Sequence, residues 1–152
     1  MNKKVYLLIQ SINKKGEIVI CVSEDIGVCI RRVKTLDPES SDTFDITHRP
    51  GVIYISNVIK NIHCRIISRE LRDMTGNTLY VLSKMYEIDG DETERIHYVF
   101  ESMEKAVNNI KSISKDFSCV SKGIDKWTYN VRHNNPVFGQ TGKWMIRKYI
   151  IK

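Results

Sequence analysis

The stretch that decides the fold runs from Leu79 to Ile113 and reads LYVLSKMYEIDGDETERIHYVFESMEKAVNNIKSI. Two runs rich in β-branched and aromatic residues flank an acidic turn near residues 89–94, which is typical of a β-hairpin. After Phe100 the apolar residues recur at spacings of three and four, which predicts an amphipathic helix near residues 102–115. This stretch therefore predicts the order strand, strand, helix.

An earlier stretch, VYLLIQSINKKGEIVICVSEDIGVCIRRVKTL from Val5 to Leu36, repeats this order, with its helix near residues 24–36. Placing Cys21 on Tyr98 and reading on without a gap aligns the apolar helix positions of the two stretches. The aligned pairs are Ile26 with Met103, Cys29 with Ala106, Ile30 with Val107, Val33 with Ile110 and Leu36 with Ile113. We therefore expect two similar halves, residues 1–76 and 77–152, from an internal duplication, with Ile30 and Val107 in equivalent buried sites.

The composition favours strands over helices. Ile and Val number 34, against six Leu and one Ala. β-branched residues fit pleated surfaces, whereas Leu and Ala are the usual helix formers. The expected fold is α+β: two ββα-centred halves with a mainly antiparallel sheet and two helices, which together could form one compact domain.

The segment between the two halves allows two interpretations. Residues 37–51 have the Pro, Ser, Thr and Asp content of a loop. Beyond them a hairpin about Lys60 and Asn61 would put isoleucines opposite one another on a buried face, pairing Ile59 with Ile62 and Ile55 with Ile66. The alternative is a helix over residues 57–75, closed by Gly76.

The last two predicted strands each have an apolar and a basic face. Seven Lys or Arg and one Asp lie between residues 117 and 152, a net charge of +6. Strand alternation puts the two Trp on the apolar faces and five other side chains on the outward faces, namely Lys126, Arg132, Lys143, Arg147 and Tyr149. This set predicts a face that binds nucleic acid or an acidic partner, with Tyr149 available for stacking; the alternative is a solvated face that keeps the sheet soluble.

The turn of the second hairpin is acidic, with carboxylates at Asp89, Asp91, Glu92 and Glu94. An EF-hand loop needs Gly at its sixth position and Glu at its twelfth, but this chain has Glu94 and Phe100 there. We therefore expect an acidic contact element and no metal site.

Catalytic signatures are missing from the sequence. His48, His63, His97 and His133 are isolated, and no Ser lies in a GxSxG motif. The glycines at 139 and 142 depart from phosphate-loop spacing, and the four Cys form no CxxC motif. We expect a binding protein without catalytic residues or cofactor. The first residues lack the pattern of a signal peptide, and no apolar run is long enough for a membrane span, so we also expect a cytoplasmic protein that does not bind membranes.

Part of the second half resembles a small, poorly characterised bacterial and phage domain with the order strand, strand, helix, strand. The residues that match its pattern are Tyr80, Val81, Leu82, Tyr86, Asp89, Gly90, Val99, Phe100, Ser102 and Ala106. The resemblance covers about 35 residues. It implies the fold and carries over no activity.

Three functions follow as hypotheses. The first is a protein from a phage or mobile element that binds and blocks a host protein, or a protein–nucleic acid complex, using the acidic turn or residues 37–51. The second is a direct nucleic-acid binder that uses the C-terminal basic face. The third is a nucleotide-binding sponge or nucleotide-acting enzyme with a pocket between the halves. An exposed strand edge could also make a homodimer.

Overall fold

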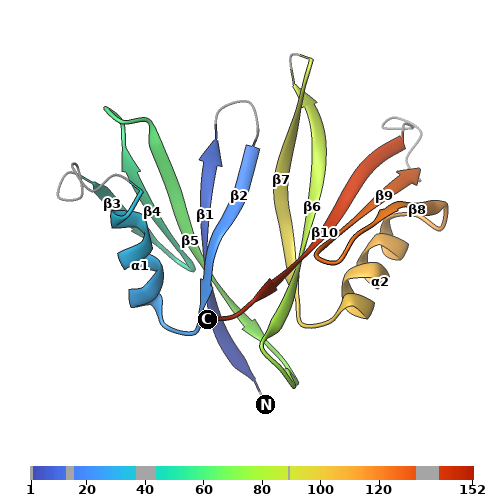
Figure 1. Ribbon diagram of the computed structural model, residues 1–152, viewed down its shortest axis with the longest axis horizontal. Helices are drawn as coiled ribbons and strands as arrows, with labels where there is room; N and C mark the ends of the chain where they lie inside the picture. The colour runs from blue at the N-terminus through green and yellow to red at the C-terminus, as the bar shows by residue number, and fades with distance from the viewer. Residues whose placement is uncertain (1, 13–15, 37–43, 89, 133–140) are drawn as a thin grey trace. The chain divides into compact units, whose positions relative to one another are not determined.

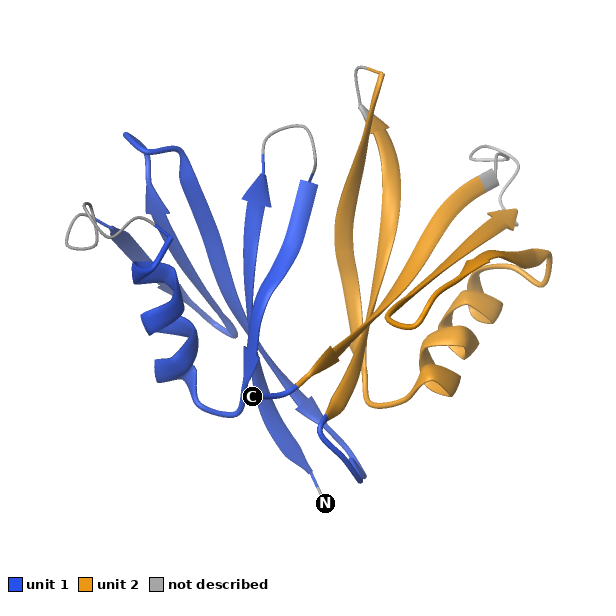
Figure 2. Cartoon of the chain, in the orientation of Figure 1, with its two compact units in different colours: residues 1–77, 151–152 blue, residues 78–150 orange. Residues whose placement is uncertain are grey.

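A computed structural model describes residues 2–12, 16–36, 44–88, 90–132 and 141–152. The chain divides into two compact units, coloured separately in Figure 2. The first unit comprises Met1–Asn77 with Ile151–Lys152, and the second comprises Thr78–Ile150. Both are α+β, as predicted.

The first unit is a five-stranded antiparallel sheet with one helix (Figure 1). Its elements are β1 Lys3–Ile12, β2 Gly16–Ser23, α1 Ile26–Lys34, β3 Asp45–Arg49, β4 Val52–Asn57 and β5 Ile62–Leu71. The strands lie in the order β3-β4-β5-β1-β2. The two strands of the first hairpin thus form one side of the sheet, and the strands that follow the helix form the other.

The second unit has the same order of elements along the chain. They are β6 Thr78–Ile88, β7 Asp91–Phe100, α2 Met103–Ile113, β8 Phe117–Lys122, β9 Lys126–Arg132 and β10 Thr141–Ile150. Its antiparallel strands lie in the order β7-β6-β10-β9-β8, which matches the first unit when β6 corresponds to β1. The topology is shared, while descent from a duplication stays a prediction.

A β-bulge occurs at the same place in both units. The β1–β2 register shifts between Leu8 and Ile9 and skips Ile20, and the β6–β7 register shifts between Leu82 and Ser83 and skips His97. A bulge inserts an extra residue and re-aims the side chains beside it. His97 and Ile20 are therefore equivalent positions with very different side chains.

Side-chain caps begin both helices. The Asp25 carboxylate accepts a hydrogen bond from the Gly27 amide at 2.8 Å, and the Ser102 hydroxyl accepts one from the Lys105 amide at 3.1 Å. Such caps satisfy amides that have no partner within the helix. The sequence-based helix limits were one to two residues too generous at each end.

The buried helix positions differ in part from those expected. Each helix buries two residues, Cys29 and Val33 in α1 and Ala106 and Ile110 in α2. These are two of the pairs that the gap-free alignment matched. Ile30 and Val107 are only partly buried, so the expectation that they are the fully buried pair was wrong. Ile30 and Val107 pack at the margin of the two cores, beside these fully buried positions.

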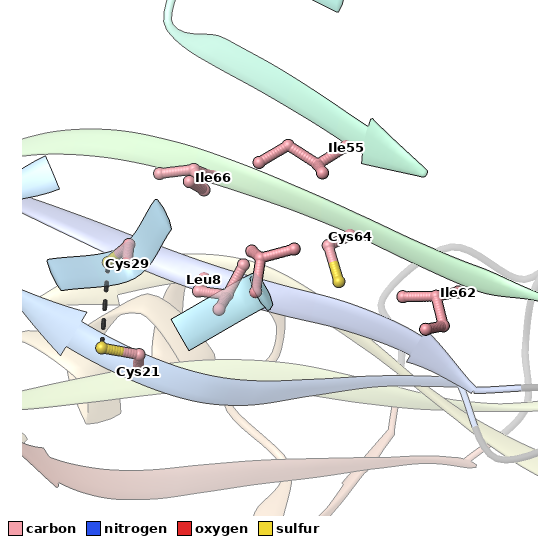
Figure 3. Close-up of a cluster of buried hydrophobic side chains, with 8 residues drawn as sticks. Leu8, Cys21, Cys29, Ile55, Ile62, Cys64 and Ile66 are labelled. Carbon is pink, nitrogen blue, oxygen red and sulfur yellow. Dashed lines mark hydrogen bonds between the residues drawn. The ribbon is translucent and has the colours of Figure 1, made fainter. Parts of the chain in front are cut away.

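In the first unit α1 covers one face of its sheet, and the side chains between them form a core (Figure 3). The buried members are Leu8, Cys21, Cys29, Val33, Ile55, Ile62, Cys64 and Ile66. The thiol of Cys29 donates to the Cys21 sulfur, and the two Sγ atoms lie 3.9 Å apart. The second unit has a matching core beneath α2, made of Leu82, Ala106, Ile110, Tyr129, Val131, Trp144 and Ile146.

The cysteines provide a direct test of this packing. Burial raises the pKa of the Cys29 thiol to about 12 and that of Cys64 to about 11, whereas Cys119 is exposed. Because the thiolate is the reactive form, we expect Ellman's reagent to titrate only Cys119 in the native protein and all four thiols in denaturant. Prompt reaction of a second thiol without denaturant would contradict the burial of Cys21, Cys29 or Cys64.

Two expectations for the middle of the chain need correction. The predicted hairpin forms, but Ile53 pairs with Ile66 and Ile55 with Cys64, two residues away from the expected register. The shift arises because the turn comprises residues 58–61, whereas the expected turn was Lys60 and Asn61 only. Ile59 therefore lies in the turn and is exposed. Residues 45–49, expected in a loop, form β3, while residues 37–43 lie outside the described residues.

Neither helix in the described part of the chain has the length and apolar character that crossing a bilayer would require.

Candidate functional site

The sequence-predicted basic residues lie on one face of the second unit's sheet. Strands β9 and β10 are neighbours, with Lys126 opposite Arg147 and Lys143 opposite Asn130. Trp144 and Ile146, which alternate with these residues, pack in the core beneath α2. Alternation therefore puts the whole predicted set on the face away from α2. We call it the basic set: Lys126, Arg132, Lys143, Arg147 and Tyr149.

Acidic residues neutralise most of this basic set. Lys143 Nζ lies 3.5 Å from Glu92 Oε1, and Arg147 Nη2 lies 2.7 Å from Glu94 Oε1. Arg132 lies 3.9 Å from the carboxylate of Asp116, which precedes β8. The predicted basic face and the predicted acidic turn thus meet and form ion pairs with each other.

The pair between Arg147 and Glu94 is the most closely bound of these contacts. Arg147 Nε donates to Glu94 Oε2 at 3.0 Å, its Nη2 donates to Oε1, and the Ser83 hydroxyl donates to Oε2 at 2.7 Å. The hydrogen bond to Glu94 raises the pKa of Arg147, although burial acts in the opposite direction. The first unit has a similar pair, in which Arg65 Nη2 lies 2.7 Å from Glu17 Oε2.

The remaining predicted contact residues are placed less favourably for binding. Tyr149 is partly buried, and burial is the main reason that its pKa is raised. In the acidic turn Asp91 is exposed, Glu92 and Glu94 are paired with cations, and Asp89 lies outside the described residues. Within the described residues, no three His, Cys, Asp or Glu side chains gather as a metal site would need.

The ion pairs change what charge reversal on this face should do. Strand alternation alone predicts that changing both Lys143 and Arg147 to Glu leaves the fold nearly intact, because it puts both side chains on the outward face of the sheet. We now expect Arg147→Glu to lower the free energy of unfolding by about 2–3 kcal/mol, because it puts a second carboxylate beside the largely buried Glu94. Lys143→Glu, at an exposed pair, should cost less than about 1 kcal/mol. Urea unfolding measures both, and equal small effects would contradict the role of the Glu94 pair.

The β6–β7 hairpin carries, on the face opposite to Glu94, a group of cationic and aromatic side chains that sequence analysis missed. We call it the β6–β7 cluster: Lys84, Tyr86, Arg95, His97 and Tyr98. It lies on the face that carries α2, since Lys84 is two residues from the core residue Leu82 on β6 and therefore shares its face. The cluster is partly accessible, and Tyr98 is 52% exposed.

Aromatic contacts hold the cluster together. Lys84 Nζ lies 4.9 Å from the centre of the Tyr86 ring and 5.5 Å from that of Trp144. The Tyr86 hydroxyl and His97 Nε2 are 3.1 Å apart, and the His97 ring lies 5.2 Å from Trp144 and 6.2 Å from Tyr98. The aromatic rings therefore form a connected row beside a cation.

The two cations of the cluster come from neighbouring strands of the hairpin. Lys84 and Arg95 are directly paired in the β6–β7 register. Like charges at paired positions destabilise a sheet. No carboxylate of the described residues forms an ion pair with either side chain. This pair thus differs from Lys143 and Arg147, whose charges are balanced within the unit.

A buried donor lies beside the cluster. The Trp144 side chain is almost fully buried, and its Nε1 makes no hydrogen bond to any described residue. Buried polar groups normally have partners, and an unpaired donor costs roughly 1–3 kcal/mol. The indole ring of Trp144 also contacts His97 and Lys84, so the unsatisfied group belongs to the surroundings of the cluster.

The first unit has no such cluster at the equivalent positions. When the two units are aligned at the bulge that they share, Lys84 corresponds to Gln10, Arg95 to Ile18 and His97 to Ile20. These side chains are uncharged, although the backbone register is the same. The cationic and aromatic character is therefore a feature of the second unit's sequence and does not follow from the topology.

Comparisons with family models, with curated proteins and with solved structures each gave no match to this chain. The resemblance of residues 80–106 to a bacterial and phage domain stays a prediction.

Proposed function

We propose that this chain binds single-stranded nucleic acid through the β6–β7 cluster. The observation that carries the proposal is the pair of Lys84 and Arg95, which no carboxylate of the described residues neutralises, beside the exposed ring of Tyr98. Cations and an accessible aromatic ring on one sheet face are the combination that single-stranded nucleic acids require.

Each side chain has a distinct part in this interaction. Lys84 and Arg95 would neutralise backbone phosphates, which removes their mutual repulsion. Tyr98, the most exposed ring, would stack on an unpaired base. Because bases in a duplex are already stacked on one another, this arrangement favours single strands over duplexes.

The ion pairs support this site over the two surfaces that the sequence suggested. The charges of Lys143 and Arg147 are already balanced by Glu92 and Glu94. The same pairs weaken the hypothesis that the acidic turn mimics nucleic acid to block a host protein, since Glu94 would have to leave Arg147 and Ser83.

Fluorescence polarisation of labelled oligonucleotides tests the proposal. We expect single strands to bind more tightly than duplexes of the same length. Two phosphate contacts predict a slope of about −1.4 for the logarithm of the binding constant against the logarithm of salt concentration. Absence of binding at low salt, or a preference for duplexes, would overturn the proposal.

The opposed cations make a further prediction. Arg95→Gln should raise the free energy of unfolding by about 0.5 kcal/mol, because it removes like-charge repulsion. The same substitution should weaken nucleic-acid binding, since one phosphate contact is lost. Urea unfolding and fluorescence polarisation measure the two effects. A variant that is less stable than the parent protein would argue against an uncompensated pair.

A further inference from the structure

Strand β3 is an edge strand of the first unit's sheet, and no described strand pairs with its outer edge. It is the last strand in the order β3-β4-β5-β1-β2, and all five of its residues are exposed. Its register with β4 is continuous from Asp45 to Arg49. An exposed edge strand presents unpaired backbone amides and carbonyls, to which another strand can bind.

The corresponding edge strand of the second unit is less suited to pairing. The register between β8 and β9 shifts between Cys119 and Ser121, and the strand ends in Lys122. Bulges and edge lysines are features by which proteins discourage pairing of edge strands. Strand β3 has no bulge in its register with β4, and its two charged residues are of opposite sign.

The sequence of β3 is complementary to itself in the antiparallel direction. If two copies pair about Thr47, Asp45 of each lies opposite Arg49 of the other. Neither charge forms an ion pair with another described residue of its own chain. The pairing would also cover Ile46, which is 54% exposed.

We propose that two copies of this chain form a homodimer through antiparallel pairing of their β3 strands. Opposite charges at paired positions stabilise the dimer, and they also select its register, because a shift would put Asp45 opposite an uncharged residue. The proposal is independent of nucleic-acid binding, since β3 and the β6–β7 cluster belong to different units.

Sedimentation velocity from micromolar to millimolar protein tests the dimer. We expect a monomer–dimer equilibrium that Asp45→Arg weakens at least about tenfold, because two attractive pairs become repulsive. Adding Arg49→Asp should restore dimerisation, since the charges are then exchanged. Lys122→Asp, a control on β8, should leave it unchanged.

Several results would overturn this proposal. They are a monomer at every concentration, a dimer insensitive to Asp45→Arg, and association only with a foreign extended peptide. Circular dichroism of each variant distinguishes lost pairing from lost folding. We expect each variant to keep the fold, because Asp45 and Arg49 are exposed.

Discussion

Replacing both Lys84 and Arg95 by glutamate is expected to weaken binding of single-stranded oligonucleotides about a hundredfold at low salt, because two phosphate contacts become repulsive. The salt dependence of any remaining binding should be nearly flat. The fold should persist, since both side chains are at least partly exposed and neither belongs to the core. Fluorescence polarisation measures the affinity, and circular dichroism measures the folded fraction.

The control for this variant is Lys126→Glu with Lys143→Glu. It makes the same change in net charge on the opposite face of the same sheet, at two residues of the sequence-predicted basic set. We expect it to reduce affinity only slightly, through the general field of the protein. A larger loss in the control than in the Lys84 and Arg95 variant would move the binding site to the face that the sequence suggested.

Ile110→Ala is expected to lower the free energy of unfolding by about 3–4 kcal/mol. Ile110 is fully buried on the face of α2 that packs against the sheet, so truncation removes apolar contacts and leaves a cavity in the core of the second unit. Val107→Ala, on the same helix but only partly buried, should cost about 1 kcal/mol.

Chemical denaturation of the two helix variants measures the difference between them. Equal effects at positions 107 and 110 would contradict the orientation of α2. A loss below about 1 kcal/mol for Ile110→Ala would contradict its burial, since large-to-small core substitutions of this type cost more.

The fold class could be predicted because its signals are local. Alternation in the strands and the apolar spacing of the helices gave both ββα units. The alignment matched Cys29 with Ala106 and Val33 with Ile110, and all four are buried. Register was harder, because it depends on turn length: the four residues between β4 and β5 moved the hairpin by two residues.

The candidate site could not be predicted in the same way. Alternation put Lys143 and Arg147 on one face, but only the β6–β7 and β6–β10 pairings bring Glu92 and Glu94 within reach of them. His97 was treated as isolated, since the bulge that brings it near Tyr86 and Trp144 has no sequence signature. One signal in the sequence could have indicated the cluster. Every second residue from Tyr80 to Tyr86 lies on one face of the strand, which predicts that Lys84 lies beside the ring of Tyr86.

Ultraviolet cross-linking of a single-stranded oligonucleotide, followed by mass spectrometry of the attached peptides, tests the location of the site most directly. Bases that stack on the cluster should cross-link to Tyr86, His97 or Tyr98, so the modified peptides should come from residues 78–100. The Lys84→Glu and Arg95→Glu double variant should lose these cross-links. Cross-links confined to residues 122–152, or none at all at low salt, would contradict a nucleic-acid site on the β6–β7 cluster.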